Sequence, residues 1–205
     1  MAVHVLFVML LLLAAPAVLA QEDDWDDDWD DEAALPDELH GIVEVGTASR
    51  LVDDPTQPGD FVMNEARFRL DLEHVTDRAD LRFEGDVIAD EVTERIDLDI
   101  RQALVALQPG SAVALRLGRQ VMTWGTGDLL FLNDLFPKDF VAFFIGRDDE
   151  FLKAPANAVR ATAYSPVANL DVAWMPRFTP DRTLTGERLS FFAPISGQRV
   201  GMETL

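Results

Sequence analysis

The chain has 205 residues, a formal net charge of −20 and no cysteine. The missing cysteines exclude disulfide bonds, thiolate metal sites and cysteine nucleophiles. So acidic a chain disfavours nucleic acid as a partner, because DNA and RNA are themselves polyanions. The length suits one domain or part of a larger one.

Residues 1–20 have the layout of a secretory signal peptide. An apolar run broken by Pro16 ends in Val18-Leu19-Ala20, which predicts cleavage before Gln21. The first residues hold no Lys or Arg, so an uncleaved anchor is the alternative. The short apolar length, Pro16 and the acidic run that follows favour cleavage and export. The mature chain has no second apolar run long enough for a membrane helix.

Residues 21–39 form an acidic segment that we expect to be a disordered arm. Eleven acidic residues and no basic residue fall within 22–38, a charge density that opposes collapse into a core. The alternative is loose binding of divalent cations or of a basic partner, with Trp25 and Trp29 as anchors. The run lacks the turn glycine of a calcium loop, so no specific metal site is predicted.

From His40 onward, apolar and polar residues alternate with a period of two, which predicts β-strands rather than helices. In 62–73, Phe68, Leu70 and Leu72 share one face, and the charged residues share the other. The expected strands are 41–49, 62–73, 80–87, 95–104, 111–124, 157–164 and 169–176, with a weaker eighth at 188–194. Most connections are too short for crossover helices, so the sheet should be antiparallel.

Short turns and longer loops alternate along this predicted sheet. The short turns are 76–80, 108–111 and 165–169; the other connections are 51–60, 89–94, 125–156 and 177–187. Of the connections in this second group, only 89–94 is short. This asymmetry is typical of a transmembrane β-barrel, which turns its apolar face to lipid and its charged face to a watery lumen. A soluble β-sandwich, which would bury the apolar face, is the alternative.

We therefore predict an all-β, antiparallel up-and-down transmembrane β-barrel over residues 40–205, partial, with about seven or eight strands. The predicted pore-lining residues are Glu65, Arg67, Arg69, Asp71, Arg82, Glu84, Asp86, Asp97, Asp99, Arg101, Arg116 and Arg119. Arg119 joins them through a β-bulge expected at Gly118. Trp124 and Trp174 are predicted for the aromatic girdle, with packing under the loop as the alternative for Trp124.

The long extracellular loop 125–156 is too apolar for an open hairpin. One hypothesis is that it folds in short helical turns into the barrel mouth and narrows the pore. The alternative is that it packs over the rim as a cap.

The stretches "LGRQVMTWGTGD", "FPKDF" and "GRDDEFLKAPANAVRATAYSP" resemble bacterial outer-membrane barrel proteins similar to porins of the alginate-export type. The resemblance covers roughly residues 40–200 and implies a barrel in the outer membrane. Such exporters have an arginine-rich lumen suited to an anionic polymer. Here carboxylates offset the arginines, which favours neutral or cationic small solutes. The ending "GQRVGMETL" lacks a terminal aromatic strand, so we expect an N-terminal fragment of a larger barrel.

The predicted function is an outer-membrane porin-like channel for small solutes, saccharide-related ones among them, with outer-membrane lipid as a partner and oligomer formation left open. The alternative is a soluble secreted or periplasmic β-sandwich binding protein. An outer-membrane hydrolase is less favoured, because the mature histidines His40 and His74 stand in no nucleophile motif. No catalytic residue and no cofactor is predicted.

Overall fold

A computed structural model describes residues 39–76, 79–124 and 134–204. The predicted signal peptide, the acidic arm up to residue 38 with its cation-binding alternative, and residues 125–133 of the long loop lie outside the described residues. Leu39, placed in the arm by the sequence, begins the first strand.

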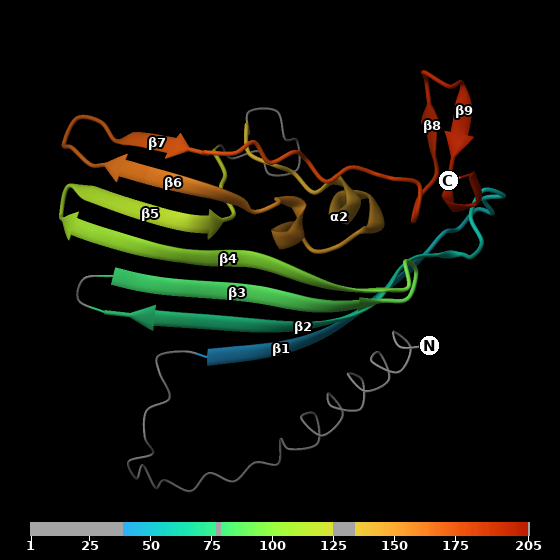
Figure 1. Ribbon diagram of the computed structural model, residues 1–205, viewed down its shortest axis with the longest axis horizontal. Helices are drawn as coiled ribbons and strands as arrows, with labels where there is room; N and C mark the ends of the chain where they lie inside the picture. The colour runs from blue at the N-terminus through green and yellow to red at the C-terminus, as the bar shows by residue number, and fades with distance from the viewer. Residues whose placement is uncertain (1–38, 77–78, 125–133, 205) are drawn as a thin grey trace, which may run out of the picture.

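Seven antiparallel strands form one sheet in which each strand pairs with the next along the chain (Figure 1). They are β1 (Leu39–Ser49), β2 (Phe61–Val75), β3 (Ala79–Asp90), β4 (Arg95–Gly110), β5 (Val113–Gln120), β6 (Ala156–Ala163) and β7 (Leu170–Trp174). The prediction of an all-β antiparallel fold is confirmed. The sheet is open, since β1 and β7 each pair along one edge only.

The connections at the two ends of the sheet differ in length. The turn-end connections are residues 76–78, 111–112 and 164–169, and the loop-end connections are 50–60, 91–94 and 121–155. The first group lies at the left of Figure 1, and the connections 50–60 and 91–94 lie at the right. The alternation of short and long connections therefore follows the sequence prediction.

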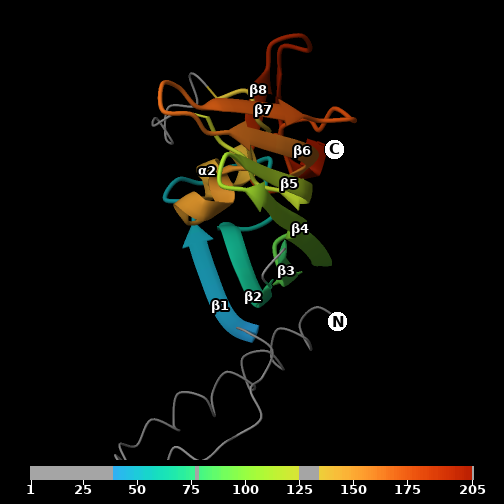
Figure 2. The ribbon, with the colours of Figure 1, turned by 90° about the vertical axis from the view of Figure 1, so that its left-hand side faces the viewer.

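The alternation of side chains gives the sheet two chemically different faces. Phe68 of β2 pairs with Val43 and Val87 on the neighbouring strands, whereas the next residue, Arg69, pairs with Asp86 on the opposite face. Seen along the strands, the sheet curves into an arc with helix α2 (Phe140–Ile145) on its inner side (Figure 2). We call the face with Arg69 the concave face and the face with Phe68 the convex face.

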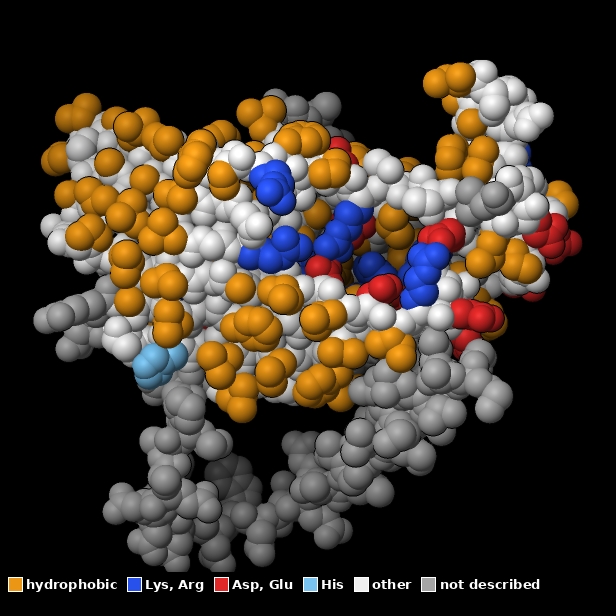
Figure 3. Space-filling view, in the orientation of Figure 1, with side chains coloured by type: hydrophobic (Ala, Val, Ile, Leu, Met, Phe, Trp, Pro, Cys, Tyr) orange, Lys and Arg blue, Asp and Glu red, His pale blue; other side chains and the backbone are white. Residues whose placement is uncertain are grey.

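The convex face is apolar and open. Leu98 is 69% exposed and Trp174 is 63% exposed, although both side chains are large and hydrophobic. Other exposed convex residues are Val43, Val45, Phe68, Leu81, Ile96, Leu117, Leu170 and Val172. Figure 3 shows hydrophobic side chains spread over the strands, with charged side chains gathered mainly in a hollow toward the loop end.

Residues 134–155, which we call the inner segment, cover the part of the concave face toward the loop end. It contains α2 and a short 3-10 helix, η1 (Asp149–Leu152). Ile145 packs against Val62 and Met63 of β2, and Phe136 packs near the ends of β5 and β6 with Met122. The hydrophobic core therefore consists of small clusters between the inner segment and the sheet. Within the described residues, no helix is both long and apolar enough to cross a membrane.

The expected eighth strand, 188–194, does not join the main sheet, so that prediction is wrong. Its residues Phe191–Ala193 form β8, which pairs with β9 (Gln198–Val200) in a separate two-stranded hairpin. The chain turns back at Gly197, whose φ of 66° suits glycine, so β8 finds a local partner instead of β7. A last 3-10 helix, η2 (Met202–Thr204), bonds to the loop 50–60 through Glu203 N and Thr56 O, 3.1 Å apart.

Candidate functional site

The predicted pore-lining residues, Arg119 apart, lie on the concave face. Glu65, Arg67, Arg69 and Asp71 come from β2, Arg82, Glu84 and Asp86 from β3, Asp97, Asp99 and Arg101 from β4, and Arg116 from β5. Cross-strand pairs place several of them side by side, such as Asp71 with Glu84 and Asp86 with Asp99. The period-two pattern alone was sufficient to collect them on one face.

Asp86 is the centre of a buried ion network. It is 0% exposed and accepts hydrogen bonds from Arg67 Nη1 at 2.6 Å and Arg69 Nε at 2.8 Å. Arg67 is itself only 3% exposed and also donates to Glu65 at 3.0 Å. A buried carboxylate is tolerated only when charges and hydrogen bonds compensate its desolvation, and these two guanidinium groups supply both.

The inner segment adds charges of its own to this network. Arg147 donates to Glu65 at 2.6 and 3.0 Å, and Glu150 accepts from Arg69 at 3.0 and 3.1 Å. Arg101 Nη2 donates to the backbone carbonyl of Glu150 at 2.6 Å. Charge-assisted hydrogen bonds therefore fasten the inner segment to two strands, β2 and β4.

The ring of Phe151 lies against three of these guanidinium groups. The guanidinium carbons of Arg67, Arg69 and Arg101 are 4.0, 5.1 and 4.9 Å from the ring centroid. Phe151 is also buried in a hydrophobic cluster with Ala142 and Leu152. This arrangement combines cation–π attraction with an apolar anchor, so Phe151 closes the network from the inner-segment side.

The local sequence explains why the inner segment turns so sharply. Asp139 caps α2, since its side chain accepts from Ala142 N at 2.8 Å. Gly146 ends the helix with a φ of 78°, a left-handed conformation favoured by glycine. Asp139 N also donates to Leu152 O at 2.8 Å, so both ends of the segment are held together before β6 begins.

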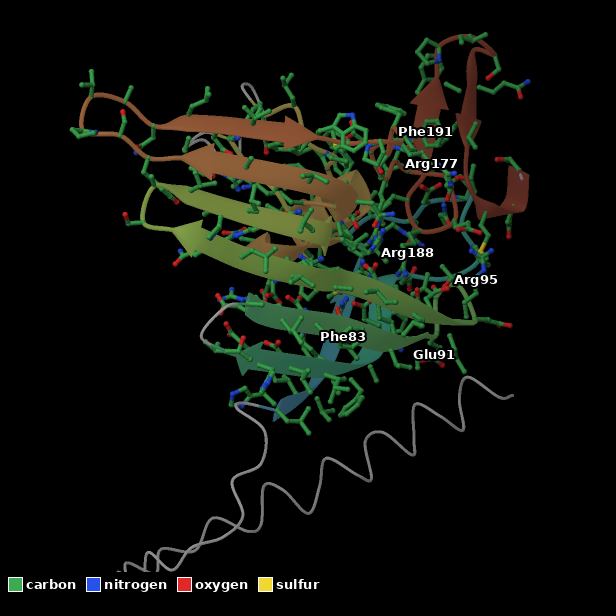
Figure 4. The ribbon with its side chains drawn as sticks, turned by 60° about the vertical axis from the view of Figure 1, so that its left-hand side comes forward. Phe83, Glu91, Arg95, Arg177, Arg188 and Phe191 are labelled. Carbon is green, nitrogen blue, oxygen red and sulfur yellow. The ribbon has the colours of Figure 1, made fainter. Side chains whose placement is uncertain are left out.

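Two further ion pairs lie where the loop end of the sheet meets the C-terminal segment, a region in which Figure 4 labels Arg95 and Arg188. Arg95 binds Glu187 at 2.6 Å, and Arg188 pairs with the buried Asp90. Nearby, Arg182 binds Asp99 at 2.8 Å and Asp139 at 3.1 Å. The hydrogen bonds with Asp99 are the main cause that raises the pKa of Arg182, so this bridge stays charged at every physiological pH.

The bulge expected at Gly118 is found elsewhere, and the prediction is wrong in its position. β5 pairs with both neighbours without a shift around Gly118, whereas β4 bulges where Glu84 and Gly85 face Gln102 and Ile100. The extra residue, Arg101, shares Glu84 with Gln102 through bonds of 3.0 and 2.7 Å. One carboxylate with two donors from β4 explains why the bulge forms there.

Gly118 has a different role, a close approach between strands. Its φ is 131°, and a Cβ atom there would lie 2.3 Å from the carbonyl oxygen of Ala103. Arg119 does not point freely outward, because its Nε donates to the carbonyl of Ile100 beside the bulge. Arg119 is therefore bonded across to β4, and its register with Ala103 differs from that of the concave-face residues.

The two predicted girdle tryptophans have different positions. Trp174 is on the convex face and pairs with Val159, as the prediction requires. Trp124 instead packs edge-to-face on Phe136, 4.9 Å between ring centroids, and its Nε1 donates to Asp171 at 3.2 Å. The alternative, packing under the loop, describes Trp124, because Asp171 draws the indole toward the concave side.

Sequence reasoning missed several members of this charged face. Arg160 of β6 binds Asp171 of β7 at 2.9 and 3.0 Å, and both follow the parity that marks the concave face. The alternation could have found them. Arg147, Glu150 and Phe151 could not be found that way, because their positions depend on how the inner segment folds back.

The described residues hold no cluster of three or more His, Asp or Glu side chains arranged for a metal ion. Searches for similar proteins give no further guide: no family model, no curated protein and no solved structure matches the chain. The clearest functional feature of the described residues is therefore the chemical difference between the two faces of the sheet.

Proposed function

We propose that the chain forms part of the wall of an outer-membrane porin-like channel, with the convex face against lipid and the concave face lining a polar passage. The observation that carries the proposal is the polarity of the sheet. Charged side chains such as Arg67 and Asp86 are paired and buried inside the arc, while large apolar side chains such as Leu98 are open to the outside. A protein surrounded by water has the opposite arrangement, whereas a membrane barrel requires this one.

The soluble sandwich, the alternative function, needs a second layer over the apolar face. Among the described residues no such layer exists, and the inner segment covers the charged face instead (Figure 2). An exposed apolar surface of this extent is otherwise a liability for aggregation. Lipid is the partner that would cover this apolar surface along all seven strands at once.

The free edges of β1 and β7 also bear on the proposal. In a bilayer every backbone N–H and C=O group needs a hydrogen-bonding partner, so an open sheet must be completed. The channel therefore requires further strands, either from the same protein or from a second copy. The resemblance to alginate-export type barrels supports two parts of this proposed function, the barrel and its location in the outer membrane.

The inner segment would narrow this passage. Its contacts with Glu65, Arg69 and Arg101 hold it inside the arc, and those groups line the concave face. The remaining wall carries both signs of charge, which suits small polar solutes, neutral or cationic ones among them.

The proposal is tested by expressing the full chain in a Gram-negative host and fractionating the cells. We expect recovery in the outer membrane, extraction only with detergent, heat-modifiable migration in gels, and ion conductance after insertion into planar bilayers. Complete recovery in the soluble periplasmic fraction would overturn it.

A further inference from the structure

A cavity of about 250 Å³ opens on the concave face near the turn end of the sheet, away from the inner segment. Its polar lining includes Arg82 of β3, Gln102 of β4, Arg116 of β5, Arg160 and Thr162 of β6, and Tyr164. We propose that this cavity binds a small oxyanion, a carboxylate or phosphate group, through Arg116.

The charges around the cavity are unequally compensated. Arg82 is paired with Glu73 at 2.6 Å, and Arg160 is paired with Asp171. Arg116 forms no ion pair or hydrogen bond with any residue that the structure describes, so its positive charge is available to a ligand. Asp80 is the one carboxylate among the residues that line the cavity.

The strand register brings two positive charges together, because Arg116 lies directly opposite Arg160 on the neighbouring strand. Like charges at directly opposed positions destabilise a sheet. A bound anion between them would turn repulsion into attraction and would accept bidentate hydrogen bonds from a guanidinium group. Across β4, Arg116 faces Ala106, whose small side chain leaves the cavity its room.

The size and the remaining donors favour a small ligand. A volume near 250 Å³ corresponds to about eight water molecules at ~30 Å³ each, enough for a short carboxylate or a phosphate group. Tyr164, the only tyrosine of the chain, adds a phenolic hydroxyl at the edge of the cavity. The site differs from the network around Asp86, where each arginine already has a carboxylate partner.

A role of this cavity in solute passage depends on the proposed channel function. It adds an anion-binding step at the turn end to the expected passage of neutral or cationic solutes. The binding itself does not require conduction. A protein that binds the anion but forms no channel would remove the proposed function alone, and a channel without binding would remove this inference alone.

The test is calorimetric titration of the detergent-solubilised full chain with succinate and, separately, with inorganic phosphate. We expect saturable binding of at least one anion, and the anion that binds distinguishes a carboxylate from a phosphate ligand. Arg116→Gln should weaken binding by about tenfold or more, because a charge-assisted contact is lost.

The matched control is Arg95→Gln, which also removes an exposed arginine but lies at the loop end, bound to Glu187. Its affinity should stay within about twofold of the parent value. No binding of either anion up to about 10 mM, or equal weakening by the two variants, would overturn the inference. Gel migration and thermal unfolding of Arg116→Gln, compared with the parent, separate lost binding from lost folding.

Discussion

The strongest prediction concerns a charge placed on the convex face at mid-depth. Leu117 points outward from β5, is 36% exposed, and is flanked by Val105 and Val159 on the adjacent strands. It lies four residues from Val113, the first residue after a turn-end connection. With a rise of ~3.4 Å per residue and a tilt near 45°, Leu117 is about 10 Å into an apolar band roughly 25 Å tall.

Leu117→Arg should therefore cost about 2–4 kcal/mol in a bilayer, beyond what Leu117→Ala costs. This corresponds to a roughly 30- to 900-fold smaller folding equilibrium constant, at 1.36 kcal/mol per tenfold. In water the same arginine would stay hydrated, and the two variants would differ little. The assay is equilibrium unfolding of the protein in lipid vesicles with guanidinium chloride.

A depth control sharpens this comparison. Leu98 is more exposed than Leu117, yet it lies near the loop end of β4, three residues after Arg95. Leu98→Arg should cost only about 0–1 kcal/mol, because it sits near the interface. If Leu117→Arg is no more destabilising than Leu117→Ala, or if both arginine variants cost the same, the assignment of the convex face to lipid is refuted.

Three further predictions concern the ion network, the inner segment and the C-terminal hairpin. Asp86→Asn should destabilise the fold by about 3–5 kcal/mol in the same unfolding assay, because it removes the buried negative charge that Arg67 and Arg69 share. Asp71→Asn, which changes a carboxylate outside this network, should have a much smaller effect. Phe151→Ala should loosen the inner segment and raise single-channel conductance, whereas Phe143→Ala, on the exposed side of α2, should not. Equal conductance of the parent and both variants would contradict the proposal that the inner segment narrows the passage. Hydrogen bonds from Ser190, and to a smaller extent from Thr56, lower the pKa of Asp54 to about 2. The contribution of Asp54 to stability is therefore complete above pH 4 and is lost as the pH falls through about 2. Hydrogen-exchange protection of residues 190–193 should follow this pH course, and Asp54→Asn should remove the pH dependence.

The strands and the orientation of their charges could be predicted from sequence because both follow from a local rule. Alternation with a period of two depends only on neighbouring residues, so it placed Arg67, Arg69 and Asp86 on one face. The position of the bulge could not be predicted that way. Gly118 is the more conspicuous glycine, yet the register shift occurs at Arg101, where Glu84 of β3 binds two side chains of β4.

The same limit applies to the inner segment and to Trp124. The pairing of Arg147 with Glu65 depends on a contact between residues far apart in the chain. The same is true of the contact between the Phe151 ring and three arginines. The indole of Trp124 is directed by Asp171, 47 positions later, and not by the alternation of its own strand. Local patterns predict the faces of the sheet, whereas long-range polar contacts decide which side chains lie against them.

The orientation of the sheet in a membrane can be measured directly, because the chain has no cysteine and single cysteines can be introduced without background. Spin labels at positions 81 and 117 on the convex face, and at 82 and 116 on the concave face, would be compared in lipid vesicles. We predict that the first pair is accessible to oxygen dissolved in the bilayer and the second pair to a water-soluble nickel complex. Equal access of all four labels to the nickel complex, or the reverse pattern, would contradict the account.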